Sequence, residues 1–256
     1  MVKNLTVTFT RYGRWLSRVE LPAIRDLSLT VEPGQVAAVV GESGAGKSLL
    51  AHAILGLLPR NSSVSGDLFF DGAPLTPQRC ARLRGREIVL IPQGVTFLDP
   101  LLQVGAQIRR GQTDPDSRSR CRQVLERYGL GPETERLYPF ELSGGMARRV
   151  LIACAVMENP RLIVADEPTP GLDAQAAGRI LGHLRELAGQ GAGVLLITHD
   201  LELAVSAADK ITVFREGQTV DEASPLAFRT GEGLSHPYTR ALWRAMPQNG
   251  FEAEED

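Results

Sequence analysis

The chain has 256 residues, with 28 basic and 30 acidic side chains, so its formal net charge is −2. This near balance argues against a dedicated nucleic-acid-binding protein, which usually carries a basic surface. A hydrophobic share of 43% excludes a disordered chain, and the longest uninterrupted hydrophobic run, Val150–Met157, is far shorter than the ~20 residues that span a bilayer. The three cysteines are widely spaced and predict neither a disulfide framework nor a zinc ribbon. We expect a soluble, intracellular chain.

Two segments near the start, Leu5–Phe9 and Leu27–Val31, alternate apolar and polar side chains. Such alternation is typical of half-exposed antiparallel strands. Val36–Val40 is a short, wholly apolar run that predicts a buried strand, and the composition of Lys47–Leu58 predicts a helix. A glycine-rich loop joins this strand to this helix.

That loop matches the pattern G-x-x-x-x-G-K-[ST], which binds phosphate. Its glycines let successive backbone N–H groups face a phosphate, and the helix that follows adds the positive end of its dipole. The lysine adds a full charge, and the serine hydroxyl can ligate Mg²⁺. The residues are Gly41, Glu42, Ser43, Gly44, Ala45, Gly46, Lys47 and Ser48. One of only three lysines in the chain stands where the pattern requires it, which makes a chance match a poor explanation.

Residues 101–158 carry no clear strand pattern and predict a helical insertion in an α/β core. Before the insertion, Ile88–Ile91 reads as a strand, and the amide of Gln93 in the next turn either reaches a Mg²⁺ ion or caps the turn. Within it, Ser143–Gly145 begin an apolar helical stretch. They form either a second anion-binding helix terminus or an ordinary N-cap.

The apolar runs Leu162–Ala165 and Val194–Ile197 are separated by a helical segment, Ala174–Gln190. Strand, helix and strand in this order predict parallel pairing with a right-handed crossover. Short apolar runs of this kind suit strands that are buried on both faces.

Polar side chains follow each of these strands, at the sheet edge where the phosphate loop also lies. Asp166 could hold Mg²⁺ through water, and Glu167 could polarise an attacking water. His199 ends the next strand at the same edge. Asp173 either caps the following helix or acts at the site, and one carboxylate can do both. The tail carries a short helix, Tyr238–Met246, and ends in a solvated acidic segment.

In this order and spacing, the motifs resemble the nucleotide-binding subunit of an ATP-binding cassette (ABC) transporter over almost the whole chain. The resemblance implies an α/β P-loop NTPase (RecA-like) fold: a parallel-sheet core with an N-terminal antiparallel β subdomain and a helical insertion. The implied ATPase domain is residues 1–230, with its core at 1–92 and 159–230, a helical subdomain at about 93–158, and a short extension at 231–256. ATP and Mg²⁺ are the implied cofactors.

The resemblance also assigns roles residue by residue. Glu167 and His199 look like the catalytic pair, and Ser48, Gln93 and Asp166 like the Mg²⁺ ligands. Gly41–Ser48 and Gln93 would bind ATP, with Phe9 as the aromatic residue that stacks on adenine and Tyr12 and Trp15 as rivals. The signature and D-loop residues that would bind ATP held by a second subunit are Ser143, Gly144, Gly145 and Asp173. Arg148 and Gly171 stand where the family usually has Gln and Ala, at positions that face the partner's nucleotide.

The implied partners are a second ATPase subunit, which is a different chain in many members, and integral-membrane permease subunits served by an extracytoplasmic binding protein. The location would be peripheral, on the cytoplasmic face of the inner membrane. Tyr138–Met146 and the tail around His236–Leu242 resemble importers of oligopeptides, dipeptides and nickel. A short tail and a Q-loop that is one residue shorter than the common peptide form set nickel or a metal chelate slightly ahead of peptides as the cargo.

Two further alternatives belong to other classes. A soluble cassette ATPase acting on DNA or ribosomes usually has paired cassettes or long coiled-coil insertions, and a small-molecule kinase would not explain the Ser143–Gly145 motif.

Four apolar side chains after Gln93 have few charges among them. We expect them either to form the surface that receives a permease helix or to pack under the insertion. They are Phe97, Leu98, Leu101 and Leu102.

Overall fold

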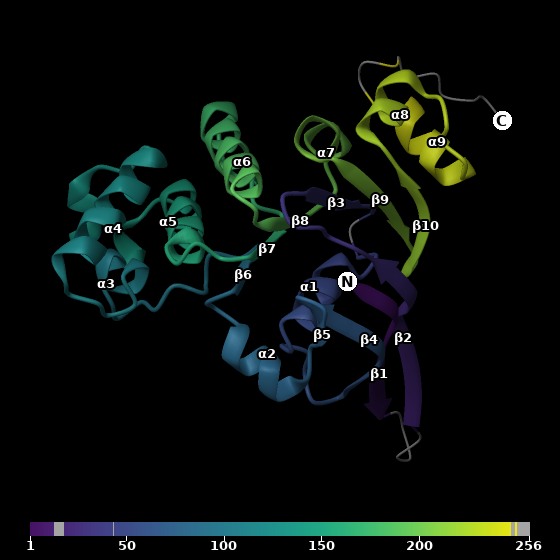
Figure 1. Cartoon of the computed structure of the whole chain (residues 1–256), viewed down its shortest axis with the longest axis horizontal. Coiled ribbons are helices and arrows are strands. Elements are labelled where there is room, and N and C mark those ends of the chain that lie inside the picture. Colours follow the sequence, from purple (N-terminus) through teal and green to yellow (C-terminus); the bar gives the residue numbers. More distant parts are fainter. Residues whose placement is uncertain (13–17, 43, 247–248, 250–256) are drawn as a thin grey trace.

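A computed structural model describes residues 1–12, 18–42, 44–246 and 249. Two sheets form its framework (Figure 1). The first is antiparallel, with strand order β2-β1-β4-β5, and comprises β1 (Val2–Tyr12), β2 (Arg18–Leu29), β4 (Ser62–Phe70) and the short β5 (Ala73–Pro74). The expected strand at Leu27–Val31 therefore ends two residues early, ahead of the turn at Pro33 and Gly34.

The second sheet has the strand order β10-β9-β3-β8-β7-β6, and only β10 runs antiparallel to its neighbour. Its strands are β3 (Val36–Val40), β6 (Ile88–Ile91), β7 (Leu162–Asp166), β8 (Gly193–Thr198), β9 (Lys210–Arg215) and β10 (Gln218–Ala223). The predicted parallel pairing of the central strands is confirmed, together with the expected α/β architecture and its N-terminal antiparallel sheet.

Apolar clusters cover both faces of the parallel sheet, which explains why its central strands have almost no polar residues. On one face, α1 (Lys47–Ile54) and the antiparallel sheet pack against side chains such as Val39 and Val164. On the other face, α5 (Gly144–Val156), α6 (Ala174–Gly189) and α7 (Leu201–Ala207) pack against side chains such as Ala38 and Ile163 (Figure 1).

The segment between β6 and β7 contains helices and no strand among its described residues, as predicted. Its helices are α3 (Val104–Ile108), α4 (Pro115–Arg127) and α5, with two 3₁₀ turns at Pro132–Arg136 and Pro139–Glu141. The remaining helices are α2 (Pro77–Leu83), α8 (Pro225–Thr230) and α9 (Pro237–Arg244). Within the described ranges, none of the helices has both the length and the apolar character that crossing a bilayer requires.

Helix α1 is shorter than the predicted Lys47–Leu58. It ends at Ile54, and Gly56 then adopts a left-handed backbone with φ +61°. The space around Gly56 is also restricted, because a Cβ there would lie 3.2 Å from Cys80 Sγ. The chain turns at this glycine and leads into β4 instead of continuing the helix.

Candidate functional site

The glycine-rich loop connects β3 to α1, as predicted, with Ser43 lying outside the described residues. A Cβ on Gly41 would lie 2.0 Å from the carbonyl oxygen of Phe214, so this position admits only glycine. Gly46 has φ +96° and forms the N-cap of α1, which places the first N–H groups of the helix at the end of the loop. The backbone therefore has the shape and polarity of an anion-binding loop.

The ammonium group of Lys47 folds back over this loop. Its Nζ donates to the carbonyl oxygens of Gly41 at 2.7 Å and Glu42 at 2.8 Å. Burial lowers the pKa of Lys47, while the negative charges of Glu167 and Asp166 act in the opposite direction. Lys47 thus joins the loop electrostatically to the carboxylates at the end of β7.

Asp166 is the last residue of β7 and is only 4% exposed. Among the described residues, its Oδ1 is a buried oxygen without a hydrogen-bond partner. Burial raises the pKa of Asp166, and a hydrogen bond with Ser48 offsets part of the rise. A buried carboxylate oxygen without a partner, next to a hydroxyl, is a donor set that fits a hard divalent cation such as Mg²⁺.

Glu167 has an unusual backbone, with φ +48°. Its N–H donates to the carbonyl oxygen of Ile197 on β8 at 2.9 Å. Its carboxylate accepts from the backbone N–H of His199 at 2.9 Å and lies 2.7 Å from the Nδ1 of the same residue. The sequence-predicted pair Glu167 and His199 is therefore in direct contact across two adjacent parallel strands.

A third residue, Thr198, holds the same carboxylate and was not singled out from the sequence. Its hydroxyl donates to Glu167 Oε2 at 3.3 Å and accepts from the backbone N–H of Asp200 at 3.0 Å. Thr198 is buried at the end of β8. Its position as the polar residue that ends an apolar strand, directly before His199, was the available signal.

Gln93 lies in the turn after β6 with an exposed side chain, and its backbone carbonyl accepts from Arg148 on α5. Another N–H of the same guanidinium donates to the carbonyl oxygen of Glu167. The family resemblance places Arg148 facing a partner's nucleotide, but these two N–H groups are used within its own chain. Two turns at the edge of the site are joined in this way.

The second group of predicted residues lies at two helix N-termini. Ser143 is the N-cap of α5, where its hydroxyl accepts from the N–H of Met146 at 3.2 Å, and Gly144 is exposed beside it. Asp173 is the N-cap of α6 and accepts from the N–H of Ala176 at 2.8 Å. The capping roles are confirmed. Gly171 has φ +77°. Glycine adopts this conformation without strain, whereas alanine, the family's usual residue at this position, would be strained.

Phe9, predicted to stack on adenine, lies on β1 with its half-buried ring against the apolar cluster around α1. Its predicted rival Trp15 lies outside the described residues, as does the side chain of Tyr12. Phe9 is thus the one of the three aromatic residues whose side-chain environment is described.

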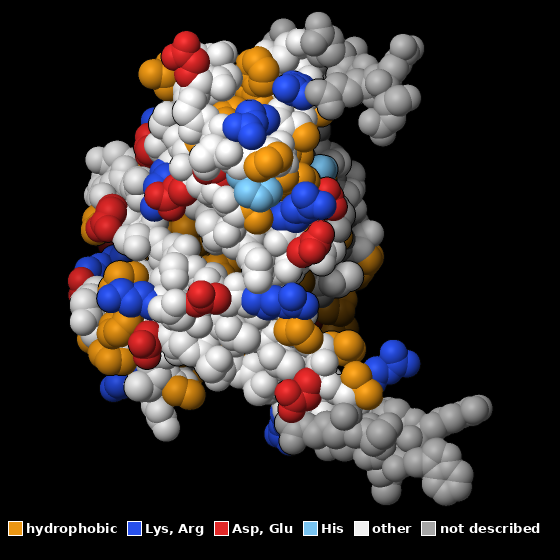
Figure 2. All heavy atoms as spheres, turned by 90° about the vertical axis from the view of Figure 1, so that its right-hand side faces the viewer, with side chains coloured by type: hydrophobic (Ala, Val, Ile, Leu, Met, Phe, Trp, Pro, Cys, Tyr) orange, Lys and Arg blue, Asp and Glu red, His pale blue; other side chains and the backbone are white. Residues whose placement is uncertain are grey.

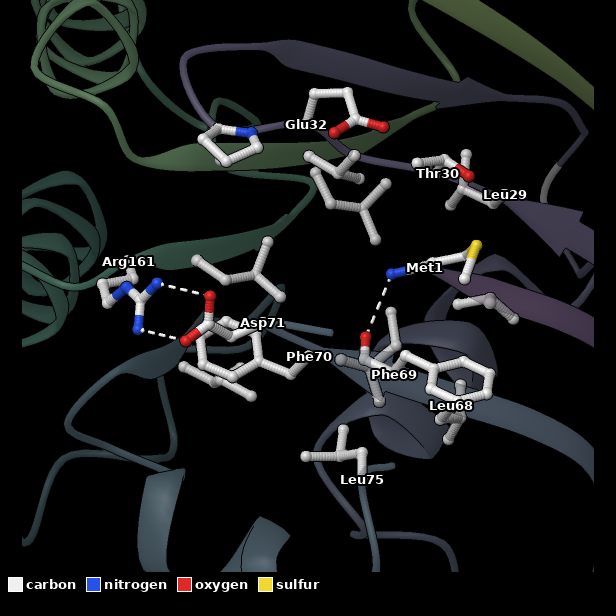
Figure 3. Close-up of a pocket in the computed structure, with 18 of the residues that line it drawn as sticks. Met1, Leu29, Thr30, Glu32, Leu68, Phe69, Phe70, Asp71, Leu75 and Arg161 are labelled. Carbon is white, nitrogen blue, oxygen red and sulfur yellow. Dashed lines mark hydrogen bonds and ion pairs between the residues drawn. The ribbon is translucent and has the colours of Figure 1, made fainter. Parts of the chain in front are cut away.

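A large cavity of about 590 Å³ lies away from these residues (Figure 3). Its lining includes Ile88, Leu162 and Gly193, which are the first residues of β6, β7 and β8. An ion pair between Asp71 and Arg161, with N–O distances of 2.9 and 3.0 Å, lies at one side of it. The candidate site occupies the carboxyl ends of the same strands, so the cavity lies at the opposite edge of the sheet.

Comparisons with known proteins agree with this geometry. Residues 24–170 match the family model described as "ABC transporter". The oligopeptide transport ATP-binding protein OppD of Lactococcus lactis subsp. cremoris is 38% identical over 96% of this chain and 75% of its own length. The protein of the same name from Bacillus subtilis is 34% identical over 100% of this chain and 74% of its own length. The dimeric ATP-binding cassette MJ0796, solved with ADP and Pi, superposes with a TM-score of 0.77 at 27% identity, covering 88% of this chain and 97% of that one.

Proposed function

The chain belongs to the ABC transporter family and is an ATPase that couples hydrolysis to transport, and we propose that it energises the import of peptides through a membrane permease. The observation that carries the ATPase part of the proposal is the convergence of Lys47, Asp166 and Glu167 at the end of the parallel sheet. The two OppD relatives are named for oligopeptide transport, which supports the peptide alternative over the nickel or metal-chelate cargo that the sequence analysis set slightly ahead.

We propose the following division of roles at one ATP. Lys47 and the backbone N–H groups of residues 41–48 bind the phosphates, and Phe9 stacks on the adenine. Ser48, Gln93 and Asp166 hold Mg²⁺, and the buried, unpartnered Oδ1 of Asp166 supports this assignment. When bound, the ion neutralises charge on the phosphates.

Glu167 is proposed to take a proton from the attacking water. Its carboxylate is nearly buried and is held by three hydrogen-bond contacts from Thr198 and His199, which fix its direction before substrate arrives. Such preorganisation lowers the barrier because little reorientation remains for the reaction step. His199, whose side chain is 56% exposed, is the part of the pair that can reach the nucleotide.

We propose that two ATPase subunits of different sequence bind head to tail in the assembled transporter. Ser143, Gly144, Gly145 and Asp173 of one subunit would then complete the ATP site of the other. The dimeric state of the MJ0796 cassette supports this arrangement, as does the exposure of the α5 N-terminus, which leaves Ser143 and Gly144 accessible to a partner.

The proposed permease contact is the exposed part of the turn after Gln93. Phe97, Leu101 and Leu102 are 61%, 83% and 47% exposed, which is unusual for large apolar side chains. Leu98, grouped with them from the sequence, is only 6% exposed and belongs to the core beneath the insertion. For Leu98 the packing alternative is correct, and the proposed contact consists of the other three.

A peripheral position on the cytoplasmic face of the inner membrane follows from this contact. We propose that residues 1–230 form the ATPase domain, with a helical subdomain at about 93–158, and that residues 231–256 form an extension.

On the face that carries α8 and α9, acidic and basic side chains are interspersed (Figure 2). A nucleic-acid-binding protein would present a basic surface, so this face does not favour the alternative of a soluble cassette ATPase that acts on nucleic acid.

The decisive experiment is to purify the chain from membranes with its permease and binding protein, and to identify the ligand that the binding protein retains. A bound peptide supports the proposal. A bound nickel chelate would restore the other cargo, and failure to associate with any membrane protein would favour a soluble ATPase.

A further inference from the structure

Arg148 connects three parts of the site that are far apart in the sequence. It lies on α5, five residues after the N-cap Ser143. Its Nη1 donates to the carbonyl oxygen of Glu167 at 2.7 Å, and its Nη2 donates to the carbonyl oxygen of Gln93 at 2.5 Å. These bonds span 19 and 55 residues of sequence. The three residues bound together are therefore on the helix α5, the turn after β7 and the turn after β6.

The bond to Glu167 acts on a residue whose backbone is strained. A residue with a Cβ is strained at φ +48° and keeps this backbone conformation only where its surroundings hold it. The N–H of Glu167 is held by Ile197, and its carbonyl is held by Arg148. Without the second bond, the peptide unit after Glu167 has one restraint fewer, and the carboxylate direction depends on that peptide unit.

A planar guanidinium is well suited to this pair of bonds, because they use its two terminal nitrogens, Nη1 and Nη2. It offers five N–H donors in a fixed fork, whereas glutamine, the usual family residue here, offers one amide nitrogen on a shorter stem. Burial lowers the pKa of Arg148, while the nearby charge of Glu167 raises it. The guanidinium is still protonated in this setting, since arginine keeps its charge in proteins.

We propose that Arg148 is a positioning residue for ATP hydrolysis, which fixes Gln93 and Glu167 relative to each other and to the helix that begins at Ser143. The inference rests on the proposed function of Glu167 as general base. Because α5 also presents the signature residues, any shift of α5 is transmitted to the Gln93 turn and the Glu167 turn of the same chain. Arg148 is thus a physical link between the signature helix and the catalytic glutamate.

The test compares Arg148→Met, which keeps an apolar stem without donors, with Arg148→Lys, which keeps the charge on one nitrogen. ATP affinity, kcat and KM are measured on the full chain assembled with its partners. We expect kcat of Arg148→Met to fall about 10- to 100-fold, the scale for a misplaced catalytic group, with ATP affinity and KM unchanged within about twofold. Arg148→Lys should lie between this variant and the original chain.

Arg185→Met is the matched control, because Arg185 on α6 pairs with Asp209 at 2.7 Å and, within the described part of the chain, forms no hydrogen bond or ion pair with a site residue. Its kcat should be unchanged. Hydrogen exchange gives a readout that does not depend on turnover. The amides of residues 93–97 and those of Glu167 and Thr169, the two residues of 167–170 that are not prolines, should exchange faster in Arg148→Met and at the wild-type rate in Arg185→Met.

Three outcomes would overturn the inference. The first is a kcat of Arg148→Met equal to that of the control, and the second is unchanged hydrogen exchange in both segments. The third is a wild-type kcat in Arg148→Lys, and this measurement decides the question if Arg148→Met does not fold. Glu167→Gln is assayed alongside. Normal turnover of that variant overturns the proposed function itself, whereas an inactive Glu167→Gln with a fully active Arg148→Met overturns only the role of Arg148.

Discussion

The Nδ1 of His199 lies 2.7 Å from Oε1 of Glu167, although 32 residues separate them in the sequence. The contact exists because β7 and β8 are adjacent parallel strands whose carboxyl ends coincide. The helix α6, its connecting turns and the strand β8 itself supply the intervening residues. A carboxylate held in this way is oriented for proton transfer before the substrate binds.

Removing the charge of this carboxylate should stop hydrolysis without stopping nucleotide binding. Glu167→Gln keeps the size of the side chain and much of its hydrogen bonding, but it cannot accept a proton. We expect turnover to fall ~10²-fold or more. Retained ATP should hold two subunits together, which gel filtration would detect as a larger species. A variant that turns over ATP normally would show that Glu167 is not the base.

Lys47→Ala should abolish productive ATP binding. The ammonium is a buried donor already directed at the carbonyls of the loop, and no other lysine lies nearby to replace it, since the remaining two are Lys3 and Lys210. Nucleotide titration measures the effect. Lys210→Ala is the matched control, because Lys210 forms an ion pair with Glu222 at 3.1 Å on the strand pair β9–β10. An ATP affinity of Lys47→Ala equal to that of the wild-type chain would mean that the nucleotide binds elsewhere.

Asp166→Asn should stabilise the protein when Mg²⁺ and nucleotide are absent. Burial raises the pKa of Asp166 above its value of ~3.9 in the unfolded chain. The folded state therefore loses stability as the pH rises through the folded-state pKa, and at pH 7.5 the ionised group is destabilising. A neutral asparagine removes this effect, and we expect Tm to rise by about 2–4 °C.

The same substitution should remove the stabilisation that Mg²⁺ and ATP add together, because a proposed ligand oxygen is lost. Asp209→Asn is the contrast, since Asp209 accepts from Arg185 and from the N–H of Val36. That variant should lower Tm. If Asp166→Asn also lowers Tm without ligands, the carboxylate has stabilising partners and the interpretation fails.

A buried histidine should make the stability depend on pH below neutrality. His183 on α6 lies 2.5 Å from the hydroxyl of Tyr128, at the end of α4, and burial lowers its pKa to about 4. The unfolded chain takes up a proton near pH 6.5 that the folded chain does not bind until about pH 4. Stability is therefore fully present above pH 6.5 and is lost as the pH falls toward 4.

Between pH 7.5 and pH 5 this histidine should cost about 2 kcal/mol of unfolding free energy. Urea unfolding at the two pH values measures the loss, and His183→Asn should reduce it. Tyr128→Phe should retain most of the pH dependence, because burial is the largest cause of the shift and the hydroxyl is not. Equal losses in His183→Asn and the original chain would contradict the assignment.

Leu101→Asp should release the chain from membranes and stop transport while leaving ATP binding intact. The side chain is 83% exposed, so the free subunit tolerates a carboxylate, but in an apolar contact with a permease helix that carboxylate costs several kcal/mol. Leu226→Asp on α8, where the leucine is 65% exposed, is the control that should stay bound. Normal transport by Leu101→Asp would exclude this surface as the contact.

Leu98→Asp should behave differently from Leu101→Asp. Its side chain is 6% exposed within the main core, so a carboxylate there should destabilise or unfold the subunit instead of uncoupling it. Thermal unfolding of the isolated chain separates the two effects. A folded Leu98→Asp variant with unchanged Tm would return Leu98 to the proposed contact surface.

The sequence by itself was sufficient to locate the glycine-rich loop, the central parallel strands and the two residues, Glu167 and His199, that we propose as the catalytic pair. Strands buried on both faces must be apolar along their whole length, so Val36–Val40 and Leu162–Ala165 were recognisable. The loop needs glycine where the backbone leaves no room for a Cβ, as at Gly41 beneath the carbonyl of Phe214. Polar residues directly after apolar strands then marked Asp166, Glu167 and His199.

Tertiary structure decided how these parts touch. The bond from Arg148 to Gln93 joins groups 55 residues apart, and Thr198 reaches Glu167 only because their strands are adjacent. Likewise, Leu98 and Leu101 are both leucines and lie three positions apart in the chain, yet Leu98 is buried and Leu101 is exposed. Local patterns cannot distinguish such cases, because burial and long-range hydrogen bonds are set by which elements pack together.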